Sequence, residues 1–149
     1  MPGKIATIRA AISTAIEAID LSAYAQGTGE THLREALTLD VEAPGFISPH
    51  LVYYLEPQDM TPGDRNRGQV FTLSTYRLSF LYRIRPNLDD VWADCDGAFD
   101  VSELVRSAVS ADLGPATIRC DRVTYLGTSQ DGAVYAVELA LTAIHSSDA

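Results

Sequence analysis

The stretch from Val70 to Arg85 constrains the fold most strongly, because its side chains alternate in kind along its length. One set of alternate positions becomes apolar and aromatic in its second half: Tyr76, Leu78, Phe80 and Tyr82. The other set carries the arginines. A period of two predicts a β-strand with one buried and one open face. Such a strand needs neighbouring strands and a covering layer, so we expect a sheet with helices on its apolar side.

Two segments carry the three-and-four spacing of apolar residues that is typical of amphipathic helices. The first runs from Ile5 to Ile19 and is rich in alanine, which favours helix. The second follows Asn87, a potential cap, with Asp89 and Asp90 in the first turn, where carboxylates suit the helix dipole. Its predicted apolar stripe is Val91, Cys95, Ala98, Phe99, Ser102, Val105 and Val109. Gly97 predicts a kink or a short break in this helix.

Three shorter strands complete the predicted secondary structure. Leu51–Leu55 is a β-branched and aromatic run. Residues 117–126 and 133–145 flank the turn 127–132, which is typical of a hairpin. Residues 33–42 also alternate, but they suit a helix as well as a strand. The sequence therefore predicts one α+β domain over residues 1–149, with an antiparallel sheet of about four strands and two helices packed on one face.

The charge and the cysteines limit the partners and the setting that we expect. The chain has 20 acidic and 11 basic residues, a formal net charge of −9, which opposes general affinity for nucleic acid. No apolar run approaches the roughly 20 residues of a membrane-spanning helix, and the N-terminal residues lack the apolar core of a secretory signal. We therefore expect a cytosolic protein without a membrane partner. Cys95 and Cys120 lack a CxxC spacing and are predicted to be free thiols.

No arrangement of residues predicts catalysis. The sequence has no nucleophile elbow, phosphate-binding loop or dinucleotide motif. Its histidines, His32, His50 and His145, lack metal-binding spacing and are expected at the surface. Asp94, Asp96 and Glu103 match part of a calcium loop, but Trp92 occupies the first ligand position, so we interpret these acidic residues as a solvated helix face. We predict no catalytic, cofactor-binding or metal-binding residue, and no enzyme activity.

Residues 57–69 are predicted to form a projecting loop that contacts a partner. Two prolines and two glycines in this segment oppose regular structure. Its charged side chains would be costly to bury without partners. The candidate contact residues are Asp59, Asp64, Arg65 and Arg67.

The order of these elements resembles the tail terminator, or tail completion, proteins of long-tailed bacteriophages and gene-transfer particles. An Ala/Ile helix opens the chain, and the strand VFTLSTYRLSFLYRI leads into the helical segment LDDVWADCDGAFDVSELVRSAV. The hairpin RVTYLGTSQDGAVYAVELALTAI follows. The resemblance covers about residues 1–20 and 50–146 and rests on the order of elements, not on a signature motif. Residues 21–49 depart from it.

This resemblance implies a structural protein of the virion neck, present in the host cytoplasm during assembly. It implies a ring, usually hexameric, that caps the tail tube, ends its polymerisation and joins it to the head connector. Its partners would be further copies of itself, the tail tube protein and the head–tail connector protein, and DNA would only pass through its channel. An acidic wall suits that passage because it repels phosphates.

Two alternatives remain open from the sequence. The first is another head–tail connector or minor tail protein, which would differ in ring size and contacts. The second is a small-molecule-binding or enzymatic α+β domain, which predicts a monomer or dimer with a ligand pocket.

Overall fold

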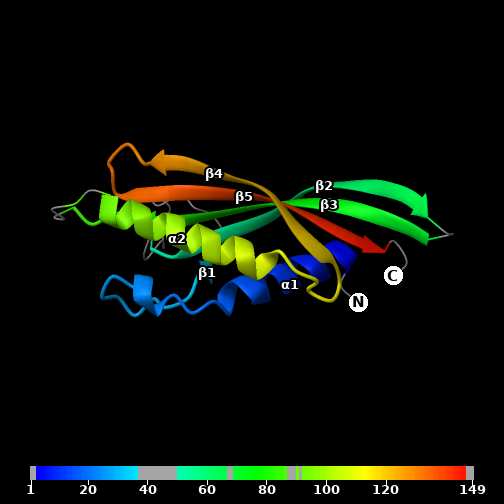
Figure 1. Cartoon of the computed structure of the whole chain (residues 1–149), viewed down its shortest axis with the longest axis horizontal. Helices are drawn as coiled ribbons and strands as arrows, with labels where there is room; N and C mark the ends of the chain where they lie inside the picture. Colours follow the sequence, from blue (N-terminus) through cyan, green and yellow to red (C-terminus); the bar gives the residue numbers. More distant parts are fainter. Residues whose placement is uncertain (1–2, 37–49, 67–68, 87–89, 91, 147–149) are drawn as a thin grey trace.

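A computed structural model describes residues 3–36, 50–66, 69–86, 90 and 92–146, and for residues 62–66, 69 and 70 it describes the backbone alone. The elements in chain order are helix α1 (Lys4–Glu17), a 3₁₀ turn η1 (Ser22–Tyr24), strands β1 (Arg34–Glu35), β2 (Val52–Asn66) and β3 (Gln69–Arg83), helix α2 (Trp92–Val109), and strands β4 (Thr117–Thr128) and β5 (Val134–Ser146). The strands form one sheet in the order β1-β2-β3-β5-β4 (Figure 1). β1 is parallel to β2, and every other neighbouring pair is antiparallel. The predicted α+β class is confirmed, with five strands because the short β1 joins the sheet.

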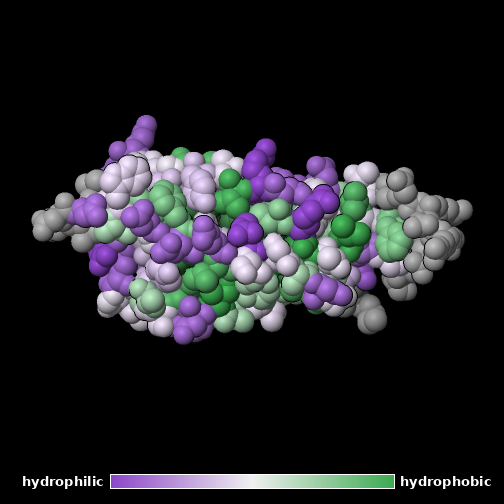
Figure 2. All heavy atoms as spheres, viewed as in Figure 1, coloured by the Kyte–Doolittle hydropathy of each residue, from purple (hydrophilic) through white to green (hydrophobic). Residues whose placement is uncertain are grey.

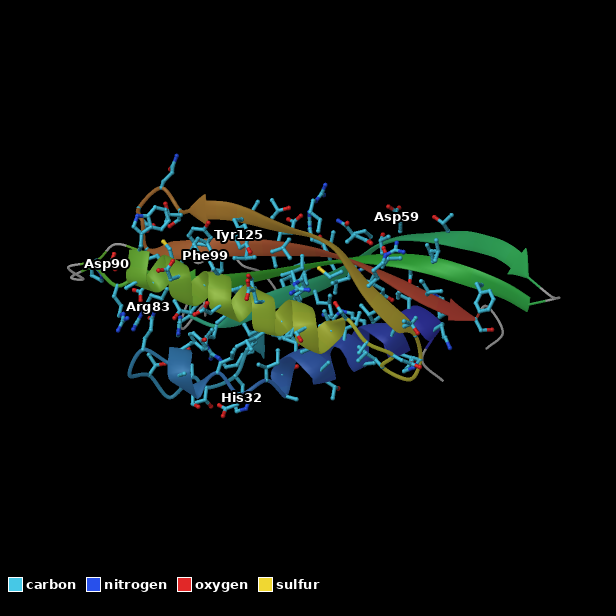
Figure 3. The ribbon with its side chains drawn as sticks, in the orientation of Figure 1. His32, Asp59, Arg83, Asp90, Phe99 and Tyr125 are labelled. Carbon is cyan, nitrogen blue, oxygen red and sulfur yellow. The ribbon has the colours of Figure 1, made fainter. Side chains whose placement is uncertain are left out.

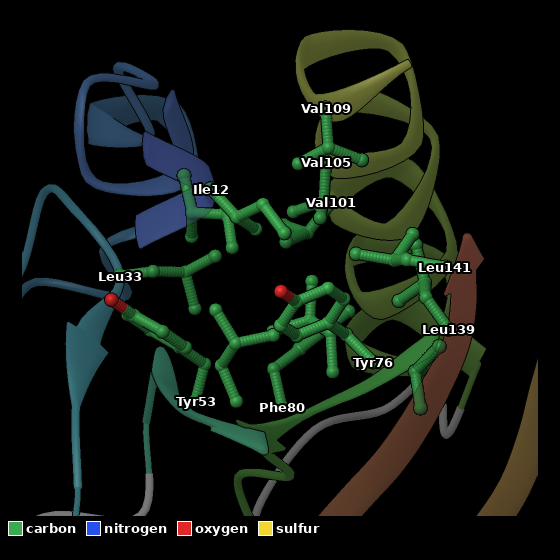
Figure 4. Close-up of a cluster of buried hydrophobic side chains, with 14 of the residues drawn as sticks. Ile12, Leu33, Tyr53, Tyr76, Phe80, Val101, Val105, Val109, Leu139 and Leu141 are labelled. Carbon is green, nitrogen blue, oxygen red and sulfur yellow. The ribbon is translucent and has the colours of Figure 1, made fainter. Parts of the chain in front are cut away.

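The core lies between one face of the sheet and the two helices. The predicted buried positions of β3 are buried, and the strand register places Tyr76, Leu78 and Phe80 opposite Leu141, Leu139 and Val137 of β5. Helix α1 contributes Ile8, Ile12 and Ile16 to this core, and α2 contributes Val101, Val105 and Val109 (Figure 4). Burial of one such side chain contributes about 1.5–3 kcal/mol. The contact between helices and sheet therefore stabilises the whole domain.

Helix α2 is continuous from Trp92 to Val109, so the predicted break at Gly97 is wrong. The glycine instead allows helix α2 to lie close to the sheet, because a Cβ at position 97 would lie 2.3 Å from the hydroxyl oxygen of Tyr82. The apolar stripe is confirmed at Cys95, Ala98, Ser102, Val105 and Val109, which are buried, whereas Phe99 is only partly buried. Asn87, Asp89 and Val91 lie outside the described residues.

Most of the segment 57–69 is β-strand, so the prediction of a loop is wrong for that part. β2 continues to Asn66 and pairs with β3, with irregularities between Pro57 and Asp59 and between Pro62 and Arg65. Beyond β1, β2 is an edge strand, where a sheet tolerates proline and bulges. Pairing with the neighbouring strand β3 thus outweighs the local composition. The β2–β3 hairpin extends past both helices at one end of the molecule (Figure 1).

The segment between α1 and β2 contains little regular structure among its described residues. β1 pairs with β2 only through Arg34↔Val52 and Glu35↔Tyr53. The strand that residues 33–42 suggested is therefore confirmed at two positions, and residues 37–42 lie outside the described part of the chain.

Candidate interaction surface

The sheet face that points away from the helices carries charged residues aligned in rows by the strand register. One row consists, in order across the sheet, of Asp59, Thr75, Thr142 and Arg119. A second row consists, in the same order, of Glu56, Arg77, Ala140 and Arg122. Each row begins with a carboxylate on β2 and ends with a guanidinium on β4. The two sides of this open face therefore differ in the sign of their charge.

Several of these groups already have partners within the chain. Arg77 donates a hydrogen bond to the Glu56 carboxylate, and Nε of Arg119 donates to Oδ1 of Asp121 at 2.6 Å. The hydroxyl of Thr142 also donates to Asp121. That hydrogen bond, with a smaller contribution from Arg119, lowers the pKa of Asp121 despite partial burial. Asp121 therefore stays ionised.

Two charged groups at the ends of the rows have no such partner. The carboxylate of Asp59 and the guanidinium of Arg122 form no ion pair with any described residue. Both residues are exposed, and Asp59 points away from the helices (Figure 3). These two charges are available to a second molecule.

Within the described part of the chain, the two edges of the sheet are only partly covered. β1 lies beside only Val52 and Tyr53, so within the described part of the chain no strand pairs with the outer edge of β2 from Tyr54 onward. At the other edge, the N–H of Ile118 bonds to the carbonyl of Ala111 at 2.9 Å, which occupies only the beginning of β4. Open strand edges are templates for pairing with another chain and need to be covered or blunted.

An aromatic cluster lies at the junction of α2 with β4. The ring of Phe99 meets Tyr125 edge-on at a centroid distance of 5.1 Å and Tyr135 at 5.5 Å (Figure 3). Tyr125 is 48% exposed and its neighbour Leu126 is 55% exposed. Apolar residues on the face drawn in Figure 2 form small groups separated by polar side chains. Tyr125 and Leu126 therefore form an exposed apolar patch on β4.

An open hollow of about 460 Å³ lies between η1 and α2, lined by Tyr24, Asp100, Glu103, Leu104, Arg106 and Ser107. Sites for small molecules typically enclose most of the ligand and are lined by apolar groups. This hollow is open to solvent, and its lining carries two carboxylates. It does not favour the alternative of a small-molecule-binding domain.

Of the four predicted contact residues, the structure describes the side chain of Asp59 alone. Asp59 is exposed on the open face. Asp64 and Arg65 belong to β2 by their backbone, but their side chains are not among those described, and Arg67 lies outside the described residues. Contact between this segment and a partner remains a prediction.

Asp94 is not on a solvated helix face, so that expectation is wrong. Its side chain is buried, and it accepts hydrogen bonds from the backbone N–H of Arg85 at 2.7 Å and from Nη2 of Arg85 at 2.7 Å. Burial alone would raise the pKa of Asp94, but the hydrogen bonds and charge of Arg85 outweigh it, so the pKa is lowered. The sequence contains a signal for this burial, because Asp94 precedes Ala98 and Val101 by four and seven residues, in the spacing of the buried stripe.

His50 and His145 are buried, so the expectation of surface histidines is wrong for both. Nε2 of His50 lies 2.7 Å from the carbonyl of Tyr24, and Nδ1 accepts a hydrogen bond of 3.1 Å from the N–H of Arg83. Burial lowers the pKa of His50. Nε2 of His145 lies 3.2 Å from the hydroxyl of Ser74. These partners come from other segments of the chain, which sequence spacing cannot identify; His32 is exposed as expected.

The other site predictions concern thiols, metals and membranes. Cys95 and Cys120 are both free thiols, as expected, and burial raises the pKa of each. Within the described ranges, no group of three or more His, Cys, Asp or Glu side chains could hold a metal ion. No helix in that part of the chain is long and apolar enough to cross a membrane.

No model of a protein family matches this chain, and no curated protein matches it in sequence.

Proposed function

We propose that the protein is a structural subunit of the neck of a bacteriophage or phage-like particle. In this role, copies of the chain form a ring that caps the tail tube, ends its polymerisation and joins it to the head connector. The order of helices and strands that carries the resemblance to tail terminators supports this proposal.

The observation that supports the proposal is the opposite charge at the two sides of one sheet, whose outer strands are only partly paired within the described residues. Among the described residues, each outer strand lacks a pairing strand over much of its length, whereas a closed ring would bring each edge against a neighbour without endless growth. The net charge of −9 is also compatible with a channel whose wall repels DNA phosphates. The chain acts, on this proposal, through contacts between subunits and without an active site.

Oligomeric state is the first measurement. Mass photometry and electron microscopy of the purified full chain should reveal a closed ring, with six copies as the expected number. A monomer or dimer at micromolar concentration, together with a bound small molecule, would favour the alternative of a ligand-binding domain or an enzyme.

Tail-tube growth is the second measurement, and it separates a terminator from another neck protein. The purified ring is added to tail tube protein that is polymerising, and tube lengths are measured by electron microscopy. A terminator binds tube ends and shortens the length distribution. A ring that leaves tube growth unchanged but binds the head connector would be another head–tail connector protein.

A further inference from the structure

We propose that the side chain of His50 is an acid-sensitive latch: it holds residues 22–29 against the end of β3 and releases them when the imidazole takes up a second proton. The sheet and both helices stay folded during this release. The contacts that form the latch lie within one chain. The inference is therefore independent of the proposed role as a ring subunit.

Two hydrogen bonds of the His50 ring determine where its proton lies at neutral pH. Nδ1 accepts a hydrogen bond of 3.1 Å from the backbone N–H of Arg83, so this nitrogen carries no proton. The single proton of the neutral ring is then on Nε2, which donates to the carbonyl of Tyr24 at 2.7 Å. Tyr24 ends η1, and Arg83 is the last residue of β3. The neutral ring therefore joins the segment 22–29 to the sheet.

A second proton on the ring is incompatible with this arrangement. It would lie on Nδ1 and face the N–H of Arg83, so that two donors would meet without an acceptor. The site offers no access to water, because His50 is fully buried and its ring packs edge-on against Tyr82 at a centroid distance of 4.7 Å. Buried donors without an acceptor destabilise the state that contains them. The protonated ring therefore favours a state in which water reaches it.

The charged groups around His50 come from three parts of the chain. The guanidinium of Arg83 on β3 opposes a positive charge on the ring, whereas Glu30 after η1 and Asp94 on α2 favour one. Both carboxylates already form ion pairs with arginines of the chain. Burial has the largest effect, and the pKa of His50 in the closed latch lies below its usual value. The latch is therefore closed at neutral pH and opens in acid.

Backbone strain occurs on both sides of the latch. Gln26 and Leu51 are the non-glycine residues with positive φ in the described part of the chain, at 57° and 55°. Such conformations cost energy and persist only while the surroundings hold them. The amide of Gln26 is held by Arg83: it donates to the Arg83 carbonyl at 2.7 Å and accepts from Nε at 2.9 Å. Release of the segment lets the strained backbone at Gln26 relax.

The segment 22–29 buries little apolar surface of its own. Among its residues only Ala25 is buried. Leu21 before the segment and Leu33 after it both belong to the hydrophobic core. Segments with few buried apolar contacts open at a low cost in free energy. Loss of the imidazole bond can therefore free this segment while the chain on either side stays in place.

Release of the segment changes the hollow between η1 and α2. Tyr24 lines this hollow, and its phenol is hydrogen-bonded to Asp100 of α2. When residues 22–29 detach, this wall of the hollow moves away and the end of β3 meets solvent. Figure 3 places Arg83 at this end of the molecule. The acid-induced change is therefore local.

Hydrogen exchange followed by mass spectrometry measures the release in the full chain, from neutral pH down to the onset of global unfolding. Protection factors, corrected for the intrinsic pH dependence of exchange, are compared for residues 21–31 and for β5. The open segment lets His50 titrate near its usual pKa of about 6.5. Below that pH, protection of residues 21–31 should fall by up to about tenfold per pH unit. β5 should remain protected on the same time scale.

Three variants assign the pH dependence to the latch. His50→Gln retains a donor for the Tyr24 carbonyl but does not titrate, so protection of residues 21–31 should be independent of pH, whatever its level. His32→Gln, at an exposed position, is the matched control and should keep the wild-type pH dependence. Gln26→Ala removes the side-chain bonds to the end of β3. It should therefore increase opening at every pH and leave the slope unchanged.

The tautomer of His50 gives a second readout that does not require a stable variant. In NMR spectra of the wild-type chain with isotope-labelled histidine, the buried ring bonded to the Arg83 N–H should carry its proton on Nε2 at neutral pH. A ring protonated on Nδ1 would contradict the latch. So would protection of residues 21–31 that does not change with pH, or that changes equally in His50→Gln. Simultaneous loss of protection in residues 21–31 and β5 would show global unfolding in place of release.

Discussion

The phenol of Tyr82 lies directly against Gly97 of α2. A Cβ added to Gly97 would be 2.3 Å from the hydroxyl oxygen of Tyr82 and 2.7 Å from its Cζ. Both distances are below 3.0 Å, a separation that Cβ atoms essentially never show from a non-bonded atom, and Tyr82 is buried in the sheet beneath the helix. Helix α2 therefore approaches β3 closely because position 97 has no side chain.

Gly97→Ala should destabilise the protein. Alanine favours helix by about 1 kcal/mol, but a methyl group inserted into a packed contact costs about 1–3 kcal/mol. We expect a net loss of up to about 2 kcal/mol, measured by chemical denaturation. Tyr82→Phe combined with Gly97→Ala should recover part of the loss, and Gly29→Ala, where a Cβ meets no atom within 4 Å, should not destabilise. A Gly97→Ala protein as stable as the wild type would contradict the close contact.

Asp94→Asn should destabilise the protein at neutral pH by about 1–3 kcal/mol, because it removes a charged acceptor of hydrogen bonds from Arg85. The pKa of Asp94 is lower in the folded chain than its usual value of about 4. Its contribution is therefore complete above about pH 4 and is lost as the pH falls through the folded pKa. The difference between wild type and variant should shrink in that acid range. Asp96→Asn, at an exposed position of the same helix, is the control.

As the pH decreases, protonation linked to His50 should begin to lower the free energy of unfolding at a higher pH than protonation of Asp94 does. Burial lowers its folded pKa below the usual value of about 6.5, so its contribution is complete above that pH. As the pH falls below 6.5, the unfolded chain binds a proton that the folded chain does not, and stability declines by at most about 1.4 kcal/mol per pH unit. His50→Asn should remove this slope below about pH 6.5, measured by urea denaturation. His32→Asn, at an exposed position, should keep it.

Arg65→Glu combined with Arg67→Glu should leave the melting temperature unchanged and weaken attachment to the tail tube or connector. The physical reason is that charge at the rim of an interface affects association more than folding. Attachment is measured by co-sedimentation with tail tubes over a range of salt concentrations, and the difference from wild type should shrink as salt rises. Attachment equal to that of wild type at low salt would place the docking surface elsewhere in the molecule.

The sequence by itself determined the elements whose periodicity is local. The two-residue alternation of β3 and the three-and-four spacing of α1 identified their type and their buried faces, because each buried side repeats within a few residues. Tyr76, Leu78, Phe80 and Ile12 all lie where these patterns placed them.

Only the tertiary structure decided features that depend on partners in other elements of the fold. Residues 57–66 form a strand because β3 satisfies their backbone groups, although their composition favours a loop. Gly97 is explained by Tyr82, and the burial of Asp94 and His50 by Arg85, Arg83 and Tyr24. The alignment of Asp59 with Arg119 likewise passes through two intervening strands. Such relationships depend on strand register, which the sheet as a whole sets, and no local pattern encodes it.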